Sequence, residues 1–465
     1  MSKAIVGVLL LGGLAPAMAQ DAPAYQEAGQ IGNPESWRTD EFNADWGLAA
    51  IGAEYAYARG LSGRGIRLGV FDSGADLGHG EFAGKDHRGI RIADLLEDGS
   101  ACTNTVALNG PDSCFMSDGD TVGVDYFHYT DEDRALVAYL VEIGYLYDWV
   151  PEYLESIAGF QYGTHGTHVA GSIVANRDGS GSHGVGFGAD LSTARLFSNS
   201  YFDLYSLLGA GGESYAIGPG SEAVASMYEQ MAAQGVRAIN HSWGLSQEPA
   251  TADDMDALYN SEGAAEYFST YTNASVNDQM IQVFAAGNGY GAIAGIYATL
   301  PRWVADAEKY WLSVVNINNT GSIDESSSIC GLSKDWCLAA PGTDITSTVV
   351  GGAIDGEVVR DEEGNFIGLD VTGEHPEYGY GDMTGTSMAA PHVTGALALL
   401  MERYPYLDNA QIRDVLLTTA TDLGDAGVDD IYGWGLMDLR KAIEGYGQIR
   451  VDTDVVMNQR AGGAK

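Results

Sequence analysis

Short apolar runs alternate with helix-like segments along most of this chain, and this alternation constrains the fold more than any other feature. The runs that we expect to form strands are Ile66–Phe71, Leu191–Phe197, Ala238–Ser242, Ile281–Ala286 and Trp311–Ile317. The helix-like segments include His168–Asn176, Ser221–Ala233 and Ala410–Thr419. Short strands separated by helices predict an α/β fold with a doubly wound, mainly parallel sheet flanked by helices. Functional sites in such sheets lie at the carboxyl ends of the strands.

The charge balance is strongly acidic and limits the kinds of partner. The 465 residues carry 64 Asp and Glu against 23 Lys and Arg, a formal net charge of −41. A nucleic-acid backbone would be repelled by this charge, so nucleic acid is not expected as a partner. We interpret the acidic surface as a means of staying soluble, with recruitment of calcium as the alternative.

The N-terminus has the pattern of a secretory signal peptide. Lys3 precedes the apolar run Ala4–Leu14, and Ala17 and Ala19 supply the small residues of a cleavage site. We therefore predict a signal peptide over residues 1–19 and a secreted protein, either periplasmic or extracellular. Because no other stretch reaches about 18 uninterrupted apolar residues, no transmembrane segment is expected in the mature chain.

The remaining residues divide by composition into three parts. Residues 20–45 are polar and acidic and are expected to form a loose leader, residues 46–447 form the folded domain, and residues 448–465 form a polar tail. Four cysteines fit an oxidising compartment and allow three disulfide connectivities. Their spacing favours the two local pairs, Cys102–Cys114 and Cys330–Cys337, and no Cys-x-x-Cys metal spacing is present.

The stretch Gly385–Val393 reads Gly-Thr-Ser-Met-Ala-Ala-Pro-His-Val and runs into the apolar segment Thr394–Met401. This pattern predicts a tight turn that places Ser387 in the first turn of a buried helix, with Pro391 where an N–H would be unpaired in any case. A helix N-terminus offers unpaired N–H donors, which suit an anionic intermediate at the serine. The alternative is that Ser387 only caps the helix.

Three other polar residues stand at strand ends or helix starts among small residues. Asp72 follows the first strand, His165 opens the segment His-Gly-Thr-His-Val-Ala-Gly, and Asn288 lies between two glycines after a strand. Taken singly, Asp72 and Asn288 are also typical of turns. His165 and His168 are three residues apart, but without the His-Glu-x-x-His arrangement a zinc site is disfavoured.

The four segments FDSG, HGTHVAG, AAGN and GTSMAAPHV together resemble the signature blocks of the subtilisin-like serine peptidases, the subtilases. The chain order Asp, His, Ser is that of subtilisin, whereas α/β-hydrolases run Ser, acid, His. The resemblance extends from about Trp46 to Tyr446. The Cys330–Gly342 stretch and the closing Tyr432–Leu439 are most similar to subtilases that are passengers of bacterial autotransporters.

This resemblance implies a role for each residue of the motifs. Ser387 would be the nucleophile, His165 the general base and acid, Asp72 the residue that orients the imidazole, and Asn288 an oxyanion-hole donor beside the Ser387 N–H. His168 and His392 would pack structurally beside the site. The residues implied to line the primary specificity pocket are Ser242, Trp243, Gly244, Ala285, Ala286 and Gly287.

The implied function is a secreted serine endopeptidase that hydrolyses peptide bonds in proteins or peptides through an acyl-enzyme. No cofactor is needed for this chemistry. Structural calcium is common in the family, and the Asn176–Gly179 loop is a candidate for it, although no ligand spacing defines a metal site. Two other classes remain open: a catalytically inactive subtilase used as a binding module, and an esterase or lipase with the same triad.

The chain departs from a minimal subtilase between its Asp and His motifs, where 92 residues intervene. The insertion, at about residues 95–160, contains Cys102, Cys114 and an aromatic run over Tyr139–Phe160. It is expected to be a packed surface subdomain, with a lid over the cleft as the alternative. Residues 20–45 are too few for an inhibitory prodomain, and we expect a released enzyme, the alternative being a fragment of a longer autotransporter. The sequence does not indicate the oligomeric state.

Overall fold

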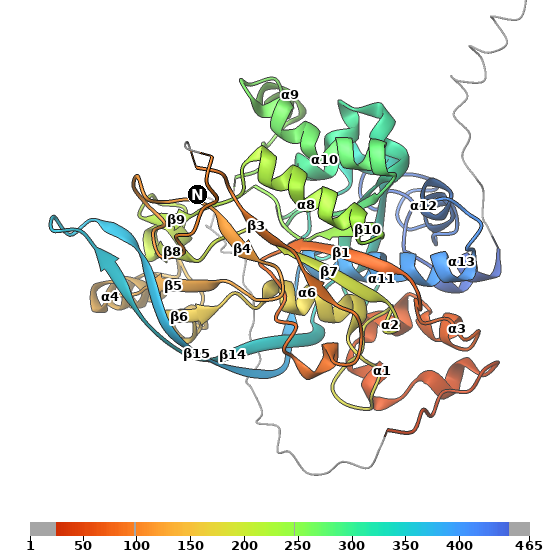
Figure 1. The fold of residues 1–465 in the computed structure, drawn as a ribbon. Coiled ribbons are helices and arrows are strands. Elements are labelled where there is room, and N and C mark those ends of the chain that lie inside the picture. Colours follow the sequence, from red (N-terminus) through yellow and green to blue (C-terminus); the bar gives the residue numbers. More distant parts are fainter. Residues whose placement is uncertain (1–24, 97–98, 246, 446–465) are drawn as a thin grey trace, which may run out of the picture.

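A seven-stranded parallel sheet forms the centre of the protein (Figure 1). The computed structural model describes residues 25–96, 99–245 and 247–445. The strand order is β13-β12-β11-β10-β1-β7-β2. The bounds are β1 Arg67–Asp72, β2 Arg88–Gly89, β7 Asp190–Arg195, β10 Val236–His241, β11 Ile281–Ala285, β12 Trp311–Ile317 and β13 Cys337–Pro341. All five expected strands belong to this sheet, so the predicted parallel α/β architecture is confirmed.

Helices cover both faces of the sheet, as expected for a doubly wound fold. The main ones are α6 His165–Val174, α8 Ser221–Ala233, α10 Ala264–Asp278, α11 Thr386–Arg403 and α12 Asn409–Thr418. The other helices are η1 Pro34–Trp37, α1 Asp40–Ala44, α2 Trp46–Ala50, α3 Ala53–Tyr57, η2 Gly80–Phe82, α4 Asp131–Glu142, α5 Val150–Ser156, α7 Leu204–Leu207, α9 Ala252–Tyr259, η3 Tyr297–Arg302, η4 Ala305–Tyr310, η5 Gly331–Trp336 and α13 Leu439–Glu444.

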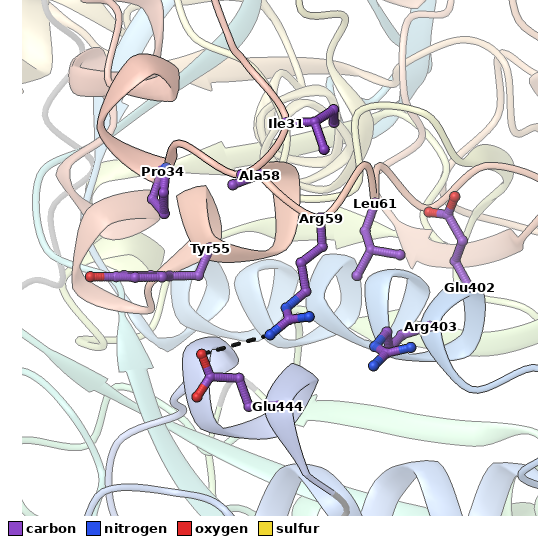
Figure 2. Close-up of a pocket in the computed structure, with 10 residues that line it drawn as sticks. Ile31, Pro34, Tyr55, Ala58, Arg59, Leu61, Glu402, Arg403 and Glu444 are labelled. Atoms are coloured by element: carbon purple, nitrogen blue, oxygen red, sulfur yellow. Dashed lines mark ion pairs between the residues drawn. The ribbon is translucent and has the colours of Figure 1, made fainter.

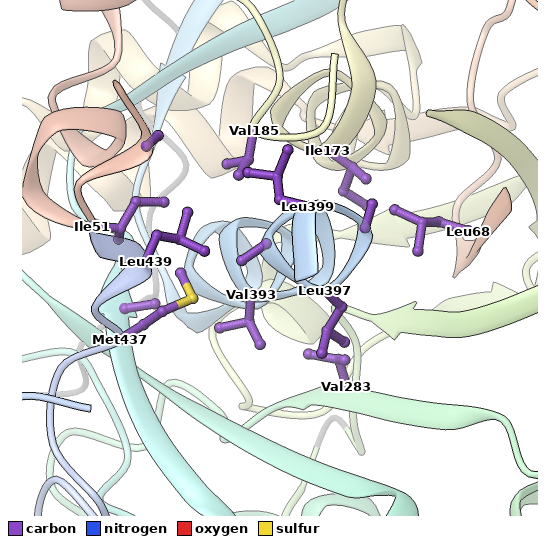
Figure 3. Close-up of a cluster of buried hydrophobic side chains, with 14 of the residues drawn as sticks. Ile51, Leu68, Ile173, Val185, Val283, Val393, Leu397, Leu399, Met437 and Leu439 are labelled. Carbon is purple, nitrogen blue, oxygen red and sulfur yellow. The ribbon is translucent and has the colours of Figure 1, made fainter. Parts of the chain in front are cut away.

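The helix α11 runs through the larger of the two main hydrophobic clusters (Figure 3). Its residues from Met388 to Met401 are buried without interruption, as expected of a helix that is apolar all round. Leu397 lies on the side facing Val283 of β11, and Leu399 lies near Val185 on the other side. This burial fixes α11, and therefore its N-terminal residues, against the sheet.

The insertion between Asp72 and His165 folds as a packed subdomain with its own four-stranded sheet, ordered β6-β5-β8-β9. Its strands are β5 Val124–His128, β6 Gly159–Tyr162, β8 Ser200–Asp203 and β9 Ser214–Ala216. A small core that includes Phe127, Val137 and Leu154 holds this sheet against α4 and α5. Residues 200–216, which follow the His165 helix in the chain, complete the same sheet. We call residues 124–162 and 200–216 the insertion subdomain.

A long hairpin reaches from the central body to this subdomain (Figure 1). It consists of β14 Ile345–Arg360 and β15 Phe366–Met383, and the remaining short strands are β3 Arg91–Ala93 and β4 Met116–Asp118. Near the hairpin's tip, Phe366 packs on Tyr201 of β8 with ring centroids 4.3 Å apart. The sequence pattern did not reveal this hairpin, because the middle of each strand, at Gly352–Glu357 and Thr372–Tyr378, is largely polar or glycine and mostly exposed.

The expectation of a loose leader before Trp46 was wrong for its described part. Trp37 and Phe42 are buried in the main hydrophobic cluster, where both rings pack on Tyr57 of α3. Two large apolar side chains are enough to anchor this otherwise polar segment. The predicted signal peptide at 1–19 and the tail at 448–465 lie outside the described residues.

Both local disulfides are present, with Cα–Cα distances of 5.9 Å for Cys102–Cys114 and 5.8 Å for Cys330–Cys337. Cys337 is the first residue of β13, so the second disulfide fixes the start of an edge strand. Within the described ranges, no helix has the length and apolarity needed to cross a membrane.

A buried ion pair ties the N-terminal segment to α11. The Nε2 atom of His392 lies 3.0 Å from Asp45 Oδ2, and the two side chains are 0% and 2% exposed. Burial lowers the pKa of His392, but the charge and hydrogen bond of Asp45 outweigh it and raise the pKa above 6.5. The contribution of the charged imidazole to stability is therefore full below pH 6.5 and is lost as the pH rises through the raised pKa.

We expect Asp45→Ala to lower the free energy of unfolding by about 3–5 kcal/mol at acid pH, because it leaves a buried group without its partner. The loss should shrink at alkaline pH, where His392 is neutral. Denaturant unfolding at acid pH and at alkaline pH measures this loss of unfolding free energy. Asp40→Ala, an exposed change in the same segment, serves as the control and should cost less than about 1 kcal/mol. Equal losses in the two variants would contradict the assignment of this pair.

Candidate active site

The site lies where the strand order of the sheet reverses direction. From β1 the chain adds β7 on one side and β10 to β13 on the other, so the carboxyl ends of β1 and β10 border a crevice. Asp72 is the last residue of β1, and Ser242 directly follows β10. This topology explains why polar residues distant in sequence meet at one edge of the sheet.

Asp72 and His165 form a hydrogen-bonded pair at this edge. The Nδ1 atom of His165 lies 2.7 Å from Asp72 Oδ1, which also accepts the N–H of Ser73 at 2.7 Å. Since a carboxylate only accepts, Nδ1 carries the proton and Nε2 is left as the free acceptor. The Asp72 side chain is 2% exposed and that of His165 is 25% exposed. The imidazole can therefore receive a proton from a group in the crevice.

Opposing effects set the basicity of this imidazole. Burial lowers the pKa of His165, but the negative charge and hydrogen bond of Asp72 outweigh it, so the net pKa is raised above the ordinary 6.5. The position after His165 must be glycine, because a Cβ at Gly166 would overlap the carbonyl oxygen of Gly74. The close approach of Gly166 to Gly74 helps to hold His165 beside Asp72.

Ser387 is the second residue of α11 and is held against β10 by a reciprocal pair of hydrogen bonds. The Ser242 hydroxyl donates to the Ser387 carbonyl at 2.7 Å, and the Ser387 hydroxyl donates to the Ser242 carbonyl at 3.1 Å. The expectation for Pro391 needs correction, because Pro391 lies inside the helix. A residue there would normally donate its N–H to the Ser387 carbonyl, and proline leaves that carbonyl for Ser242.

Asn288 is oriented by Thr386, the residue before the serine. Its Oδ1 accepts both the N–H and the hydroxyl of Thr386 at 3.0 Å, and Thr386 Oγ1 in turn accepts the N–H of Gly287 at 3.1 Å. Since a backbone N–H can only donate, these contacts fix which end of the amide is oxygen. The Nδ2 group is then left to donate beside the start of α11, where Gly385 leaves room for it. Sequence reasoning did not single out Thr386.

We expect Asn288→Ala to lower kcat by about 10²–10³-fold, because it removes the amide that is predicted to donate to the developing oxyanion. Thr386→Val should lower kcat by about 3–10-fold, since it removes the hydrogen bonds that aim the amide. Steady-state kinetics of both variants and of the double variant would measure this. Because Thr386 acts through Asn288, the double variant should be scarcely slower than Asn288→Ala alone. Simple multiplication of the two losses would show that Thr386 has another role.

The residues expected to line the specificity pocket divide into exposed and core positions. Gly244 is exposed, whereas Trp243 packs its indole into an aromatic cluster, 4.6 Å from the ring of Tyr297. Ala286 is fully buried, and Ala285 and Gly287 are partly exposed at the end of β11. The Trp243 indole therefore contributes to the hydrophobic core.

A half-buried carboxylate connects the segment that follows Gly244 to the segment at Ile296. Glu248 accepts the N–H of Leu245 at 2.9 Å and the N–H of Ile296 at 3.0 Å. Burial raises the pKa of Glu248. A Cβ at Gly244 would lie 2.8 Å from Glu248 Oε1, and the sequence did not predict this close approach.

His168 and His392 have the structural environments that were expected of them. The Nε2 atom of His168 lies 2.9 Å from the Ile345 carbonyl and 3.1 Å from that of Gly381, which fixes α6 to the base of the hairpin. Burial lowers the pKa of His168 to about 4, so the ring is neutral at ordinary pH. The neutral ring donates its Nε2–H to the carbonyl of Ile345 or to that of Gly381.

The loop Asn176–Gly179, the candidate for calcium, contains a buried cation of its own. Arg177 donates to both carboxylate oxygens of Glu27, at 2.8 and 3.1 Å, and lies 2.9 Å from His183 Nε2. In the described part of the chain, no group of three or more His, Cys, Asp and Glu side chains is arranged to hold a metal ion. The buried guanidinium of Arg177 places a positive charge in this loop, which opposes the binding of a second cation there.

A hollow of about 630 Å³ lies between the N-terminal segment and the C-terminal end of α11 (Figure 2). Arg59 and Glu444 form an ion pair of 3.9 Å across it. Arg403, which also lines it, is 16 residues beyond Ser387 on the same helix, a separation of about 24 Å along the axis. This hollow is therefore separate from the crevice that holds Asp72 and His165.

Comparisons with known proteins agree on one family. A sequence profile described as the subtilase family matches residues 63–435. The extracellular serine protease of Serratia marcescens is 34% identical over 464 residues, covering 91% of this chain and 36% of that protein. The autotransporter lipoprotein NalP of Neisseria meningitidis is 28% identical over 271 residues, covering 50% of this chain and 23% of that protein.

Among solved structures, fervidolysin from Fervidobacterium pennivorans matches with a TM-score of 0.51 and 24% identity. The match covers 95% of this chain and 51% of that chain, and it bears on the fold alone. The chain thus spans about a third of the length of the Serratia protease and about half that of fervidolysin.

Proposed function

The chain belongs to the subtilase family, and on this premise we propose that it is a secreted serine endopeptidase acting on proteins or peptides. The observation that carries the proposal is the Asp72–His165 hydrogen bond, which leaves Nε2 as a free acceptor in the crevice that Ser387 borders. Secretion is supported by the relatives that are named extracellular or autotransporter proteins. No cofactor takes part in the chemistry, and calcium is left out of the proposal.

In the proposed reaction, the Ser387 hydroxyl rotates from the Ser242 carbonyl toward the imidazole and attacks the scissile carbonyl carbon. His165 Nε2 takes the hydroxyl proton, and Asp72 stabilises the imidazolium that forms. The oxyanion accepts hydrogen bonds from Asn288 Nδ2 and from the main-chain N–H of Ser387, which has no partner within the first turn of the helix. His165 then protonates the leaving amine, and water releases the acyl group by the reverse steps.

The test treats the purified chain with a fluorophosphonate probe and with an unfolded protein, each with and without a calcium chelator. We expect a label on Ser387, located by peptide mapping, and cleavage of the protein in both conditions. Matched amide and ester substrates distinguish a peptidase from an esterase. A folded chain that neither labels nor cleaves would overturn the proposal in favour of a binding module.

A further inference from the structure

A second hollow lies directly beside His165, between the catalytic core and the insertion subdomain. Its volume is about 200 Å³, and His165 and Thr164 form its wall on the core side. Met383, at the end of β15 and four residues before Ser387, also lines it. The hollow therefore borders the histidine that is proposed to act as the base.

Apolar side chains of the insertion subdomain form most of the opposite wall. Phe127 and Phe202 come from neighbouring strands and stack with centroids 5.2 Å apart, while Tyr153 and Ile157 come from α5 and the residue that ends it. An apolar cavity of about 150 Å³ admits a benzene molecule, so this hollow has room for one large side chain. The walls are therefore suited to a leucine or phenylalanine side chain.

The acidic group in the hollow already has partners. Asp125 Oδ1 accepts the Ser200 hydroxyl at 2.5 Å. Burial raises the pKa of Asp125, and the Ser200 hydrogen bond and the charge of the half-buried Arg195 oppose this only in part. The acid already has a hydrogen-bond partner and a neighbouring positive charge within the protein, and this favours an apolar guest over a lysine or arginine.

A row of aromatic rings leads outward from the hollow over the insertion subdomain. Tyr153 packs edge-on against Trp149 at 6.1 Å, and Trp149 stacks on Tyr147 at 6.2 Å. Trp149 is 40% exposed and Tyr147 is 50% exposed. Large exposed apolar groups gathered beside a reaction site are typical of a binding surface.

We propose that the insertion subdomain supplies a substrate pocket beside His165, which takes one large apolar side chain adjacent to the scissile bond, and that the aromatic row supports the extended chain beyond it. This inference rests on the proposed peptidase function. It gives the long insertion a role in selecting substrates, because a polypeptide with a bulky apolar residue gains contacts that a small residue does not make.

The test uses quenched fluorogenic peptides that differ at one residue beside the cleaved bond, with Ala, Leu, Phe or Lys at that position. We expect Leu or Phe to be preferred over Ala by about 10–100-fold in kcat/KM on one side of the bond. Ile157→Ala and Tyr153→Ala should reduce this ratio to below about 3-fold. Tyr139→Ala, an exposed tyrosine on α4, is the matched control and should leave the ratio unchanged.

The readout is a ratio between substrates, so a variant that folds poorly slows both and does not imitate the expected result. If the wild-type protein cleaves none of the peptides and does not label, the proposed function fails. If it cleaves them without apolar preference, or if Ile157→Ala leaves the preference intact, the pocket is overturned while the function stands. A preference for Lys that Asp125→Asn abolishes would also overturn the apolar assignment.

Discussion

Replacing Ser387 by alanine is expected to lower kcat for a peptide substrate by about 10⁶-fold, the size of the loss when the nucleophile of subtilisin is removed. Without the hydroxyl no acyl-enzyme forms, and only binding and the oxyanion donors remain to assist direct attack by water. The wild-type hydroxyl donates one hydrogen bond, to the Ser242 carbonyl, so its removal should cost only about 0.5–1.5 kcal/mol of stability. The catalytic loss should therefore occur in a folded protein.

Active-site titration and single-turnover kinetics measure this effect, with the melting temperature as the check on folding. Ser261→Ala, at an exposed position after α9, is the matched control and should retain full activity. Residual activity of the Ser387 variant above about one thousandth of the wild type, free of contaminating protease, would mean that another group is the nucleophile.

The sequence predicted the residues of the crevice better than the surroundings that orient them. Asp72 and His165 stand in short motifs whose glycines are explained by close backbone approaches, as Gly166 illustrates, and such constraints are visible in the sequence. The role of Thr386 is set by contacts with Asn288 and Gly287, about 98 residues earlier in the chain, and no local pattern encodes them. The catalytic roles themselves remain predictions.

The fold was predictable where apolar periodicity is strong and was missed where polar segments pair with distant partners. The strands β11 and β12 are buried along nearly their whole length, so their sequences are almost continuous apolar runs. The hairpin β14–β15 and the strands β8 and β9 lack such runs, because each has an exposed surface. The leader was misjudged for a related reason: Trp37 and Phe42 alone anchor it, and two apolar residues make no periodic pattern.

Asp72→Asn is expected to lower kcat on the order of 10⁴-fold, since the imidazolium then forms without a neighbouring negative charge. The pH dependence gives a sharper test. In the wild-type protein, Asp72 raises the pKa of His165 above 6.5, so activity should be lost as the pH falls through that raised value. In the variant, burial still lowers the pKa of His165 while the opposing charge is gone, so the acid limb should move to lower pH.

The ratio of wild-type to variant kcat/KM should consequently decrease as the pH is lowered, because the wild-type base becomes protonated first. Profiles of kcat/KM over the range from about pH 4 to 8 would measure the acid limb of the wild type and that of the variant. Asp131→Asn, at a fully exposed acid of α4, is the control. That control should reproduce the wild-type profile, since its side chain lies on the insertion helix and carries no contact to the imidazole. An acid limb at the same pH in the Asp72 variant and the wild type would show that the titrating group is not the imidazole paired with Asp72, and the assignment of His165 as the base would then fall.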